Sequence, residues 1–186
     1  QWLVGIDEHL DAPLDMDYVQ QNFGVMLGSG AIMVFDETVD PVLVAWRLAK
    51  FFAHESCGKC TPCREGTKRM LEILTRITEG KGSPGDIEKL ERLGTMIRKA
   101  SLCGLGQSAP NPVLSTIKNF REEYEEHINQ GYCRARTCKA LIRYTINERC
   151  PNCGLCIKAC PQAAITAQGK RMPVILNQEL CIKCGS

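Results

Sequence analysis

Cysteine is the residue type with which this sequence could do chemistry, and its spacing points to iron–sulfur clusters. The 186-residue chain contains 12 cysteines. From Cys150 onward the pattern is C-x2-C-x2-C-x3-C-P, formed by Cys150, Cys153, Cys156, Cys160 and the proline that follows. Three thiolates at intervals of three residues can bind one [4Fe-4S] cluster, while the fourth turns toward a second cluster. Zinc sites seldom combine this spacing with a C-P dipeptide, so we favour clusters over a zinc ribbon.

A second copy of this pattern begins at Cys181 and Cys184. We expect Cys160, Cys181 and Cys184 to bind one cluster, with a further ligand beyond Ser186. The cluster of Cys150, Cys153 and Cys156 would then also take its fourth ligand from beyond the chain end. The motif is that of bacterial two-cluster ferredoxins, and it predicts a truncated ferredoxin-like domain over residues 150–186. Both ends of the sequence suggest a piece of a longer polypeptide, and degraded cluster sites are the alternative.

Another triple, Cys57, Cys60 and Cys63, has the same spacing without the C-P dipeptide. Its fourth ligand must come from elsewhere, and Cys103 is the candidate. We expect these four residues to bind a single [4Fe-4S] cluster. Zinc is the main alternative, because four thiolates also form a tetrahedral zinc site.

Helices are predicted to position this first set of thiols. Asp40-Pro41, Ser83-Pro84 and Asn111-Pro112 each place a good N-cap residue before a proline. Apolar residues then recur at helical spacing, predicting a helix from 41 and others over about 64–78, 84–99 and 112–128. Each helix has one apolar face, which favours an up-and-down four-helix bundle over residues 39–129. The loops after its first and third helices then lie at the same end, which brings Cys103 to the triple.

The remaining segments carry fewer signals. Residues 1–38 are poor in helix signals, and the apolar run 31–35 after a glycine-rich turn predicts a strand. No apolar run reaches the roughly 18 residues of a membrane helix, and the start does not resemble a signal peptide. A net charge of +2 gives no nucleic-acid footprint. We therefore expect a cytoplasmic protein that neither enters a membrane nor binds nucleic acid.

A third group of ligand-type residues lies in and before the linker predicted over residues 130–149. His127, Cys133 and Cys138 could hold a structural zinc that joins the ferredoxin arm to the bundle. The sequence does not identify a fourth ligand. Two reduced cysteines or a disulfide are the alternatives, and a cytosolic location disfavours the disulfide.

The stretch from Phe52 to Gly66, with Cys103-Gly104-Leu105-Gly106 downstream, resembles the cluster domain of the NADH-oxidising flavoprotein subunit of respiratory complex I. Leu27-Gly28-Ser29-Gly30 and the strand after it resemble the end of that family's β-grasp domain, which assigns residues 1–38 to such a domain. The appended ferredoxin resembles the β subunit of multimeric NAD(P)-linked, electron-bifurcating [FeFe] hydrogenases and related formate dehydrogenases. The resemblance covers essentially the whole chain.

The resemblance implies a mainly α protein with a small α+β part and up to three [4Fe-4S] clusters. FMN and NAD(P) would bind in a part of the subunit outside this sequence. The implied partners are a thioredoxin-like [2Fe-2S] subunit and a catalytic hydrogenase subunit, with ferredoxin as another. We expect electron transfer between a flavin and these partners in an NAD(P)H-linked oxidoreductase. A complex I or formate dehydrogenase subunit is an alternative, and so is a non-redox zinc module. We name no catalytic side chain.

Overall fold

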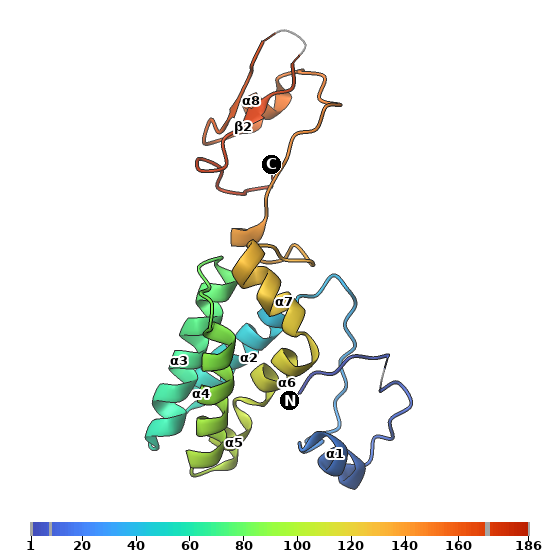
Figure 1. Cartoon of the computed structure of the whole chain (residues 1–186), viewed down its shortest axis with the longest axis vertical. Coiled ribbons are helices and arrows are strands. Elements are labelled where there is room, and N and C mark those ends of the chain that lie inside the picture. Colours follow the sequence, from blue (N-terminus) through green and yellow to red (C-terminus); the bar gives the residue numbers. More distant parts are fainter. Residues whose placement is uncertain (1, 8, 170–171, 186) are drawn as a thin grey trace. The chain divides into compact units, whose positions relative to one another are not determined.

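A computed structural model describes residues 2–7, 9–169 and 172–185. The chain divides into two compact units, residues 1–141 and 142–186. The structure is mostly helical, and Figure 1 traces the order of its elements. The first unit contains α1 (Met16–Phe23), α2 (Pro41–Glu55), α3 (Thr61–Thr78), α4 (Asp86–Ala100), α5 (Gly104–Ser108), α6 (Asn111–Asn119), α7 (Arg121–Glu125), the π-helix η1 (Glu126–Gln130) and the 3-10 helix η2 (Lys139–Leu141). The second contains α8 (Leu155–Ala159), β1 (Ile165–Thr166) and β2 (Ile175–Leu176).

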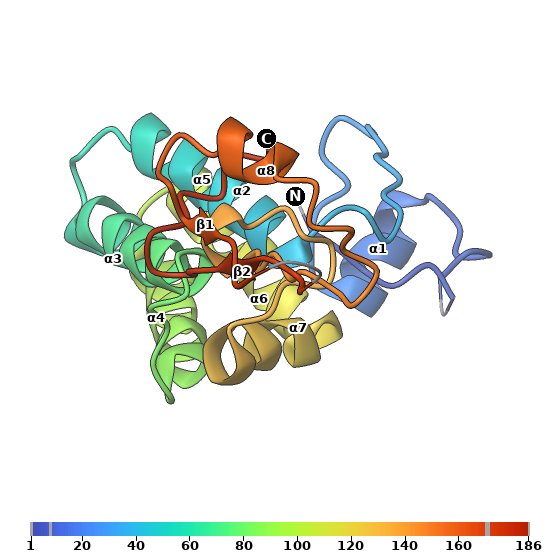
Figure 2. The same cartoon turned by 90° about the horizontal axis from the view of Figure 1, so that it is seen from above.

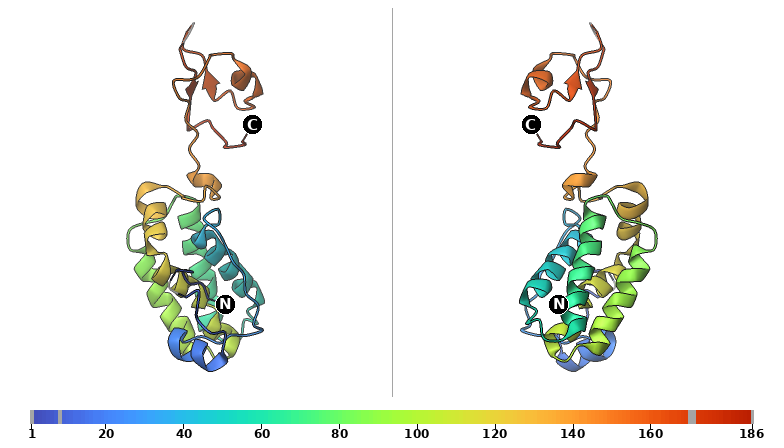
Figure 3. Two further views of the ribbon diagram at one scale, coloured as in Figure 1. Left: turned by 90° about the vertical axis from the view of Figure 1, so that its right-hand side faces the viewer. Right: turned by 90° about the vertical axis from the view of Figure 1, so that its left-hand side faces the viewer.

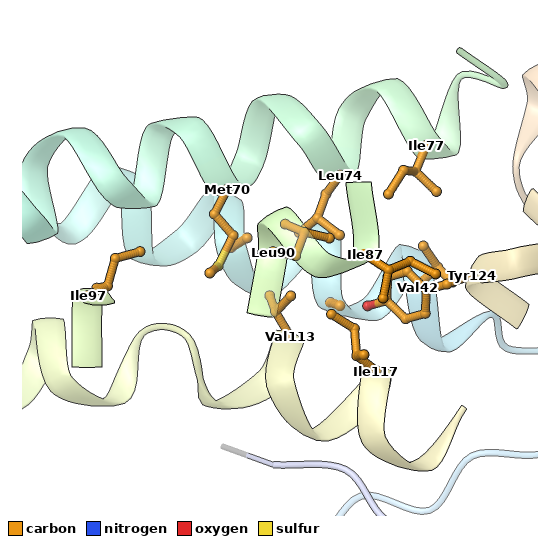
Figure 4. Packing of buried hydrophobic residues seen from close by; sticks show 12 residues of the cluster. Val42, Met70, Leu74, Ile77, Ile87, Leu90, Ile97, Val113, Ile117 and Tyr124 are labelled. Atoms are coloured by element: carbon orange, nitrogen blue, oxygen red, sulfur yellow. The ribbon is translucent and has the colours of Figure 1, made fainter. Parts of the chain in front are cut away.

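Four helices of the first unit enclose one hydrophobic core. Helix α2 packs against α3 and α6, and α4 packs against the same two helices. Figures 2 and 3 show these helices around a common interior. Their apolar faces meet there, because a helix with one apolar stripe removes it from water only against another such stripe. The buried side chains include Val42, Met70, Leu74, Ile77, Ile87, Leu90, Ile97, Val113, Ile117 and Tyr124 (Figure 4).

The segment predicted as one helix over 112–128 is interrupted. Helix α6 ends at Asn119, and Phe120 leaves the helical region with φ −136° and ψ 37°. The chain then resumes as α7 and widens into η1. This break lets Tyr124 enter the core, where its hydroxyl hydrogen-bonds Thr116 Oγ1 at 2.7 Å. Periodicity alone does not reveal such a break, because the apolar spacing on both sides of it is helical.

Helix starts also differ from the prediction at two positions. Helix α6 begins at Asn111, the residue predicted as its N-cap, and Pro110 is the N-cap instead. Asp40 caps α2 as expected, since its side chain accepts from the Val42 N–H at 2.8 Å. Helix α4 begins at Asp86 rather than Pro84, after Gly85 at φ +88°. The Ser83 N–H instead donates to the Asp86 carboxylate at 2.9 Å, so the turn before the helix is held by the helix's own first residue.

The prediction of a strand over residues 31–35 is wrong. In the described part of the chain these residues form no strand, and Ile32, Met33 and Val34 are exposed. A strand needs a partner for its backbone hydrogen bonds, and none pairs with this run here. The segment before it contains α1, which the sequence analysis missed. Asp15 caps that helix at its start, and Gly24 ends it at φ +65°.

The second unit is small and has few buried side chains. Strands β1 and β2 pair antiparallel, with Ile165 opposite Leu176. Ala164 and Val174 are its buried apolar residues among those described. The predicted linker does not begin at 130, because residues up to 141 pack with the first unit, where Leu141 contacts the buried Cys133 and Cys138. None of the described helices is both long and apolar enough to cross a membrane.

Candidate iron–sulfur and metal sites

The loops that carry Cys60 and Cys103 meet at one end of the first unit. Cys60 is the N-cap residue of α3 and Cys103 the N-cap residue of α5, so both thiols lie at helix starts. The backbone N–H groups of Leu102 and Cys63 hydrogen-bond the Cys60 sulfur and lower the pKa of its thiol. Because Leu102 is the neighbour of Cys103, this contact joins the two loops directly.

Gly106 allows this close approach. A Cβ atom at Gly106 would lie 2.6 Å from Ser101 Oγ and 3.1 Å from the Cβ of Cys63. No side chain would fit there without displacing its neighbours. Because glycine has none, the backbone of α5 can pack against the first turn of α3. The structure therefore brings the Cys103 loop against the Cys57–Cys63 motif.

Polar groups hold the Cys57–Cys63 loop in shape. The Arg64 guanidinium donates to the Gly58 carbonyl at 2.7 Å and to Glu65 at 3.0 Å. The Thr67 hydroxyl donates to the Cys63 carbonyl at 2.7 Å. These bonds orient the backbone around the cysteines and leave the thiols themselves to a ligand. Cys57 and Cys103 are exposed, Cys60 is half-buried and Cys63 is buried.

Asp40, His127, Cys133 and Cys138 form a second, fully buried group. One ligand atom from each lies within 4.8 Å of those from the other three. Asp40 Oδ2 is at the centre, 3.0 Å from His127 Nε2, 3.0 Å from Cys138 Sγ and 3.4 Å from Cys133 Sγ. His127 Nδ1 donates to the Glu123 carbonyl at 2.7 Å, which turns Nε2 toward the other ligands.

The ionisation of this group follows from its mutual contacts. Burial would lower the pKa of His127, but hydrogen bonds to Asp40 and Cys133 raise it to about 10. The hydrogen bond from Cys138 lowers the pKa of Cys133 to about 4, and the same bond raises the pKa of the Cys138 thiol. Burial opposes ionisation of Asp40, yet the bonds from His127 and Cys138 lower its pKa.

This donor set fits zinc. Two sulfurs, one imidazole nitrogen and one carboxylate oxygen are ligands that tetrahedral zinc accepts, and the backbone carbonyl on Nδ1 is the outer partner that a zinc-bound histidine normally has. A divalent cation would take the place of the protons on His127 and Cys138. Sequence reasoning found three of these residues and read Asp40 only as a helix cap. Oδ1 caps α2, and Oδ2 lies 3.0 Å from Cys138 Sγ in the buried group.

The second unit carries the remaining cysteine motifs. The Ala164 N–H donates to Cys160 Sγ at 3.3 Å. Hydrogen bonds from the backbone N–H groups of Val174 and Asn152 lower the pKa of Cys150. Cys153, Cys156 and Cys184 are exposed, and Cys181 is half-buried. No disulfide joins two cysteines of the described residues, so Cys133 and Cys138 are not bonded to each other.

Both cysteine-rich regions match known families of iron–sulfur binding domains. Residues 43–127 match the NADH-ubiquinone oxidoreductase-F iron-sulfur binding region, and residues 144–166 match a 4Fe-4S binding domain. The first match contains the Cys57–Cys63 motif and Cys103, and the second contains Cys150 through Cys160. The class that these matches define is thus an iron–sulfur binding protein.

Particular relatives refine this class. The NADP-reducing hydrogenase subunit HndC of Solidesulfovibrio fructosivorans is 44% identical over 166 residues, covering 89% of this chain and 34% of that protein. The NADH-quinone oxidoreductase F subunit of Streptomyces coelicolor is 50% identical over 127 residues, covering 68% of this chain and 28% of that protein. The chain thus spans about a third of the length of the curated relatives it matches.

A solved structure is similar in fold to about half of this chain. It is that of an NAD+-reducing [NiFe]-hydrogenase in the H2-reduced state, with a TM-score of 0.52 and 44% identity over 54% of this chain and 17% of that one. The chain therefore carries the iron–sulfur binding region of the NADH-oxidising flavoprotein subunits, followed by a 4Fe-4S ferredoxin domain.

Proposed function

We propose that this chain is the electron-transferring part of an FMN-containing NAD(P)H oxidoreductase subunit, passing electrons between the flavin and partner subunits. The observation that carries the proposal is the contact of the Cys103 loop with the Cys57–Cys63 motif, made through Leu102 and Gly106. It brings together cysteines separated by 40 or more positions in a pattern that suits one [4Fe-4S] cluster. Such a cluster supplies one-electron transfer when bound, and the protein holds it and adjusts its potential.

The proposed ligands are Cys57, Cys60, Cys63 and Cys103 for the first cluster. Cys150, Cys153 and Cys156 would bind the second, and Cys160, Cys181 and Cys184 the third, each with one further ligand outside this sequence. In this proposal residues 1–38 are the end of a β-grasp domain, residues 39–129 a four-helix cluster domain, and residues 150–186 a two-cluster ferredoxin-like domain. The short hairpin of β1 and β2 and the low burial of the second unit support the last point, since a cluster can replace a hydrophobic core in so small a domain.

We favour a hydrogenase subunit over a complex I subunit. A match of 166 residues leaves out at most 20 of the 186, so the similarity to HndC must include residues 21–166 and with them Cys150–Cys160. The 127-residue match to the Streptomyces coelicolor protein need not reach the ferredoxin motif. A multimeric, electron-bifurcating hydrogenase is the assembly we infer, with a [2Fe-2S] subunit and a catalytic hydrogenase subunit as partners, NAD(P) as the pyridine nucleotide, and the cytoplasm as its location.

We also propose that Asp40, His127, Cys133 and Cys138 bind a structural zinc ion. Asp40 precedes α2 and His127 lies on η1, whereas both cysteines belong to the segment that leads out of the first unit. A zinc ion here would tie that segment to two helices of the core. The burial of all four residues supports a structural role, because a catalytic zinc keeps one position open to water or substrate.

Metal analysis tests these proposals together. Iron, acid-labile sulfide and zinc are measured per chain in full-length protein purified without oxygen. We expect about four irons and four sulfides for each cluster, with one zinc beside them. Zinc without sulfide would replace the electron-transfer proposal with a non-redox zinc module. Iron and sulfide without zinc would remove the structural zinc and keep the electron-transfer role.

A further inference from the structure

Two serines end the helices that lead into the first cysteine site. Ser56 is the C-cap residue of α2 and Ser101 the C-cap residue of α4, and both have extended backbone angles. Each therefore lies at the start of one of the two loops that meet there. Neither hydroxyl has a part in the electron-transfer role proposed above. Their surroundings indicate what they contact.

The Ser56 hydroxyl is positioned to donate to a sulfur. Its Oγ lies 3.3 Å from Cys63 Sγ, and the Gly58 N–H donates to the same oxygen at 3.4 Å. The oxygen thus already accepts a hydrogen bond, while its own proton can point toward the sulfur. When Cys63 is a metal-bound thiolate it has no proton to give, so the serine is the donor of this pair.

The Ser101 hydroxyl is buried beside the same site. The residue is 4% exposed, and among buried side-chain polar atoms of the described residues its Oγ is the one without a hydrogen-bond partner. A buried hydroxyl without a partner is costly, and most such groups in proteins are satisfied. Around it lie Gly106 and Cys63, since a Cβ at Gly106 would be 2.6 Å from Ser101 Oγ and 3.1 Å from Cys63 Cβ.

We propose that Ser56 and Ser101 are positioning residues that donate hydrogen bonds to sulfur atoms of the first cluster site, Ser56 to the thiolate of Cys63, and so raise the midpoint potential of that cluster. The inference rests on the proposed cluster ligation. A reduced cluster carries one more negative charge than an oxidised one, so a hydrogen-bond donor at its ligand sulfurs stabilises the reduced state more. The serines that end α2 and α4 would thus set how readily the cluster accepts an electron.

Redox titration followed by EPR tests this in the full-length subunit. The signal of the first cluster is assigned as the one lost in Cys103→Ser. Its midpoint potential is then measured in the wild type, Ser56→Ala, Ser101→Ala, the double variant and Ser108→Ala. Ser108 is the matched control, because its hydroxyl donates to the Gly104 carbonyl within α5 at 2.7 Å.

We expect each single variant to lower the potential and the double variant to lower it by the sum. One net hydrogen bond shifts an equilibrium by about three- to tenfold, which at 59 mV per tenfold for one electron is about 30 to 60 mV. Ser108→Ala should leave the potential unchanged. Ser101→Thr, which keeps the hydroxyl, should stay near the wild-type value.

Several results would overturn the inference. Unchanged potentials in both alanine variants would do so, as would an equal shift in Ser108→Ala. If Ser101→Thr and Ser101→Ala both lose the cluster or shift alike, packing rather than the hydroxyl matters at that position. Absence of iron and sulfide from the wild type is a different result, because it removes the proposed function and the inference with it.

Discussion

Asp40 offers the sharpest test of the proposed zinc site, because its two carboxylate oxygens have separate tasks. Oδ1 accepts from the Val42 N–H at 2.8 Å and caps α2, while Oδ2 faces His127 and the two cysteines. Asparagine is as good an N-cap as aspartate, whereas alanine caps poorly. Asp40→Asn should therefore remove the carboxylate ligand and keep the cap, and Asp40→Ala should remove both.

The expected magnitudes follow from linkage. Zinc at a hundred times its dissociation constant stabilises the folded protein by about 2.7 kcal/mol. If loss of the carboxylate weakens binding a hundredfold, the same zinc contributes about 0.4 kcal/mol. The cap is worth about 1 kcal/mol. A zinc chelator should then lower the free energy of unfolding by about 2.7 kcal/mol in the wild type and by about 0.4 kcal/mol in either variant. In the presence of chelator, the free energy of unfolding of Asp40→Ala should be about 1 kcal/mol lower than that of Asp40→Asn.

Urea unfolding followed by tryptophan fluorescence measures these differences. Trp46 lies on α2 and donates to Thr75 Oγ1 at 2.8 Å, so its environment changes when this helix leaves the core. The chain has two tryptophans, and Trp2→Phe makes Trp46 the single reporter. Asp36→Asn is the control, since Asp36 is an exposed carboxylate that bonds Thr38. An equal response to chelator in the wild type and Asp40→Asn would refute the assignment of Asp40 as a ligand.

Three further predictions concern the first unit. Cys60→Ser and Cys103→Ser should lose the same EPR signal, and loss of different signals would contradict a shared cluster. Burial opposes ionisation of Asp86, but bonds from a backbone N–H, a lysine and an arginine outweigh it and lower its pKa. Its ionised form thus stabilises the fold above the ordinary carboxyl pKa of 3.8, and that stability is lost as the pH falls below it. Asp86→Asn should lower the free energy of unfolding by about 1–3 kcal/mol at neutral pH. Urea titrations at several pH values should also show a smaller loss of stability at acid pH in this variant. Gly94→Ala places a Cβ 2.9 Å from Leu114, and overpacking of about 1–3 kcal/mol should exceed its gain of about 1 kcal/mol in helix propensity. Thermal unfolding of the double variant with Leu114→Ala should show coupling, whereas additivity would mean that Leu114 moves aside freely.

Local patterns in the sequence predicted much of the first unit. Residues from Pro41 to Ala100 form three helices near the predicted ranges, because caps, prolines and apolar periodicity act within a few residues. The cysteine motifs were likewise readable, since a cluster needs thiolates at short fixed intervals. The strand at 31–35 was predicted wrongly for the converse reason, because a strand depends on a distant partner that no local pattern reveals.

The fourth member of the zinc group shows the limit of such reading. Asp40 is 87 positions from His127, and its sequence context, an aspartate before a proline, indicates only a helix cap. The break at Phe120 and the π-helix η1 are also tertiary features. They accompany the burial of Tyr124 and His127.

The sequence by itself determined which residues could bind iron and zinc and which segments become helices, because both depend on short-range spacing. Tertiary structure decided what these residues meet. Packing of α2, α3, α4 and α6 brings the Cys103 loop to Cys60 and places the Asp40 cap against His127 and two cysteines. It also buries the Ser101 hydroxyl close to Gly106 and Cys63. Such contacts join residues far apart in the chain, and they arise when the apolar faces of the helices share one core.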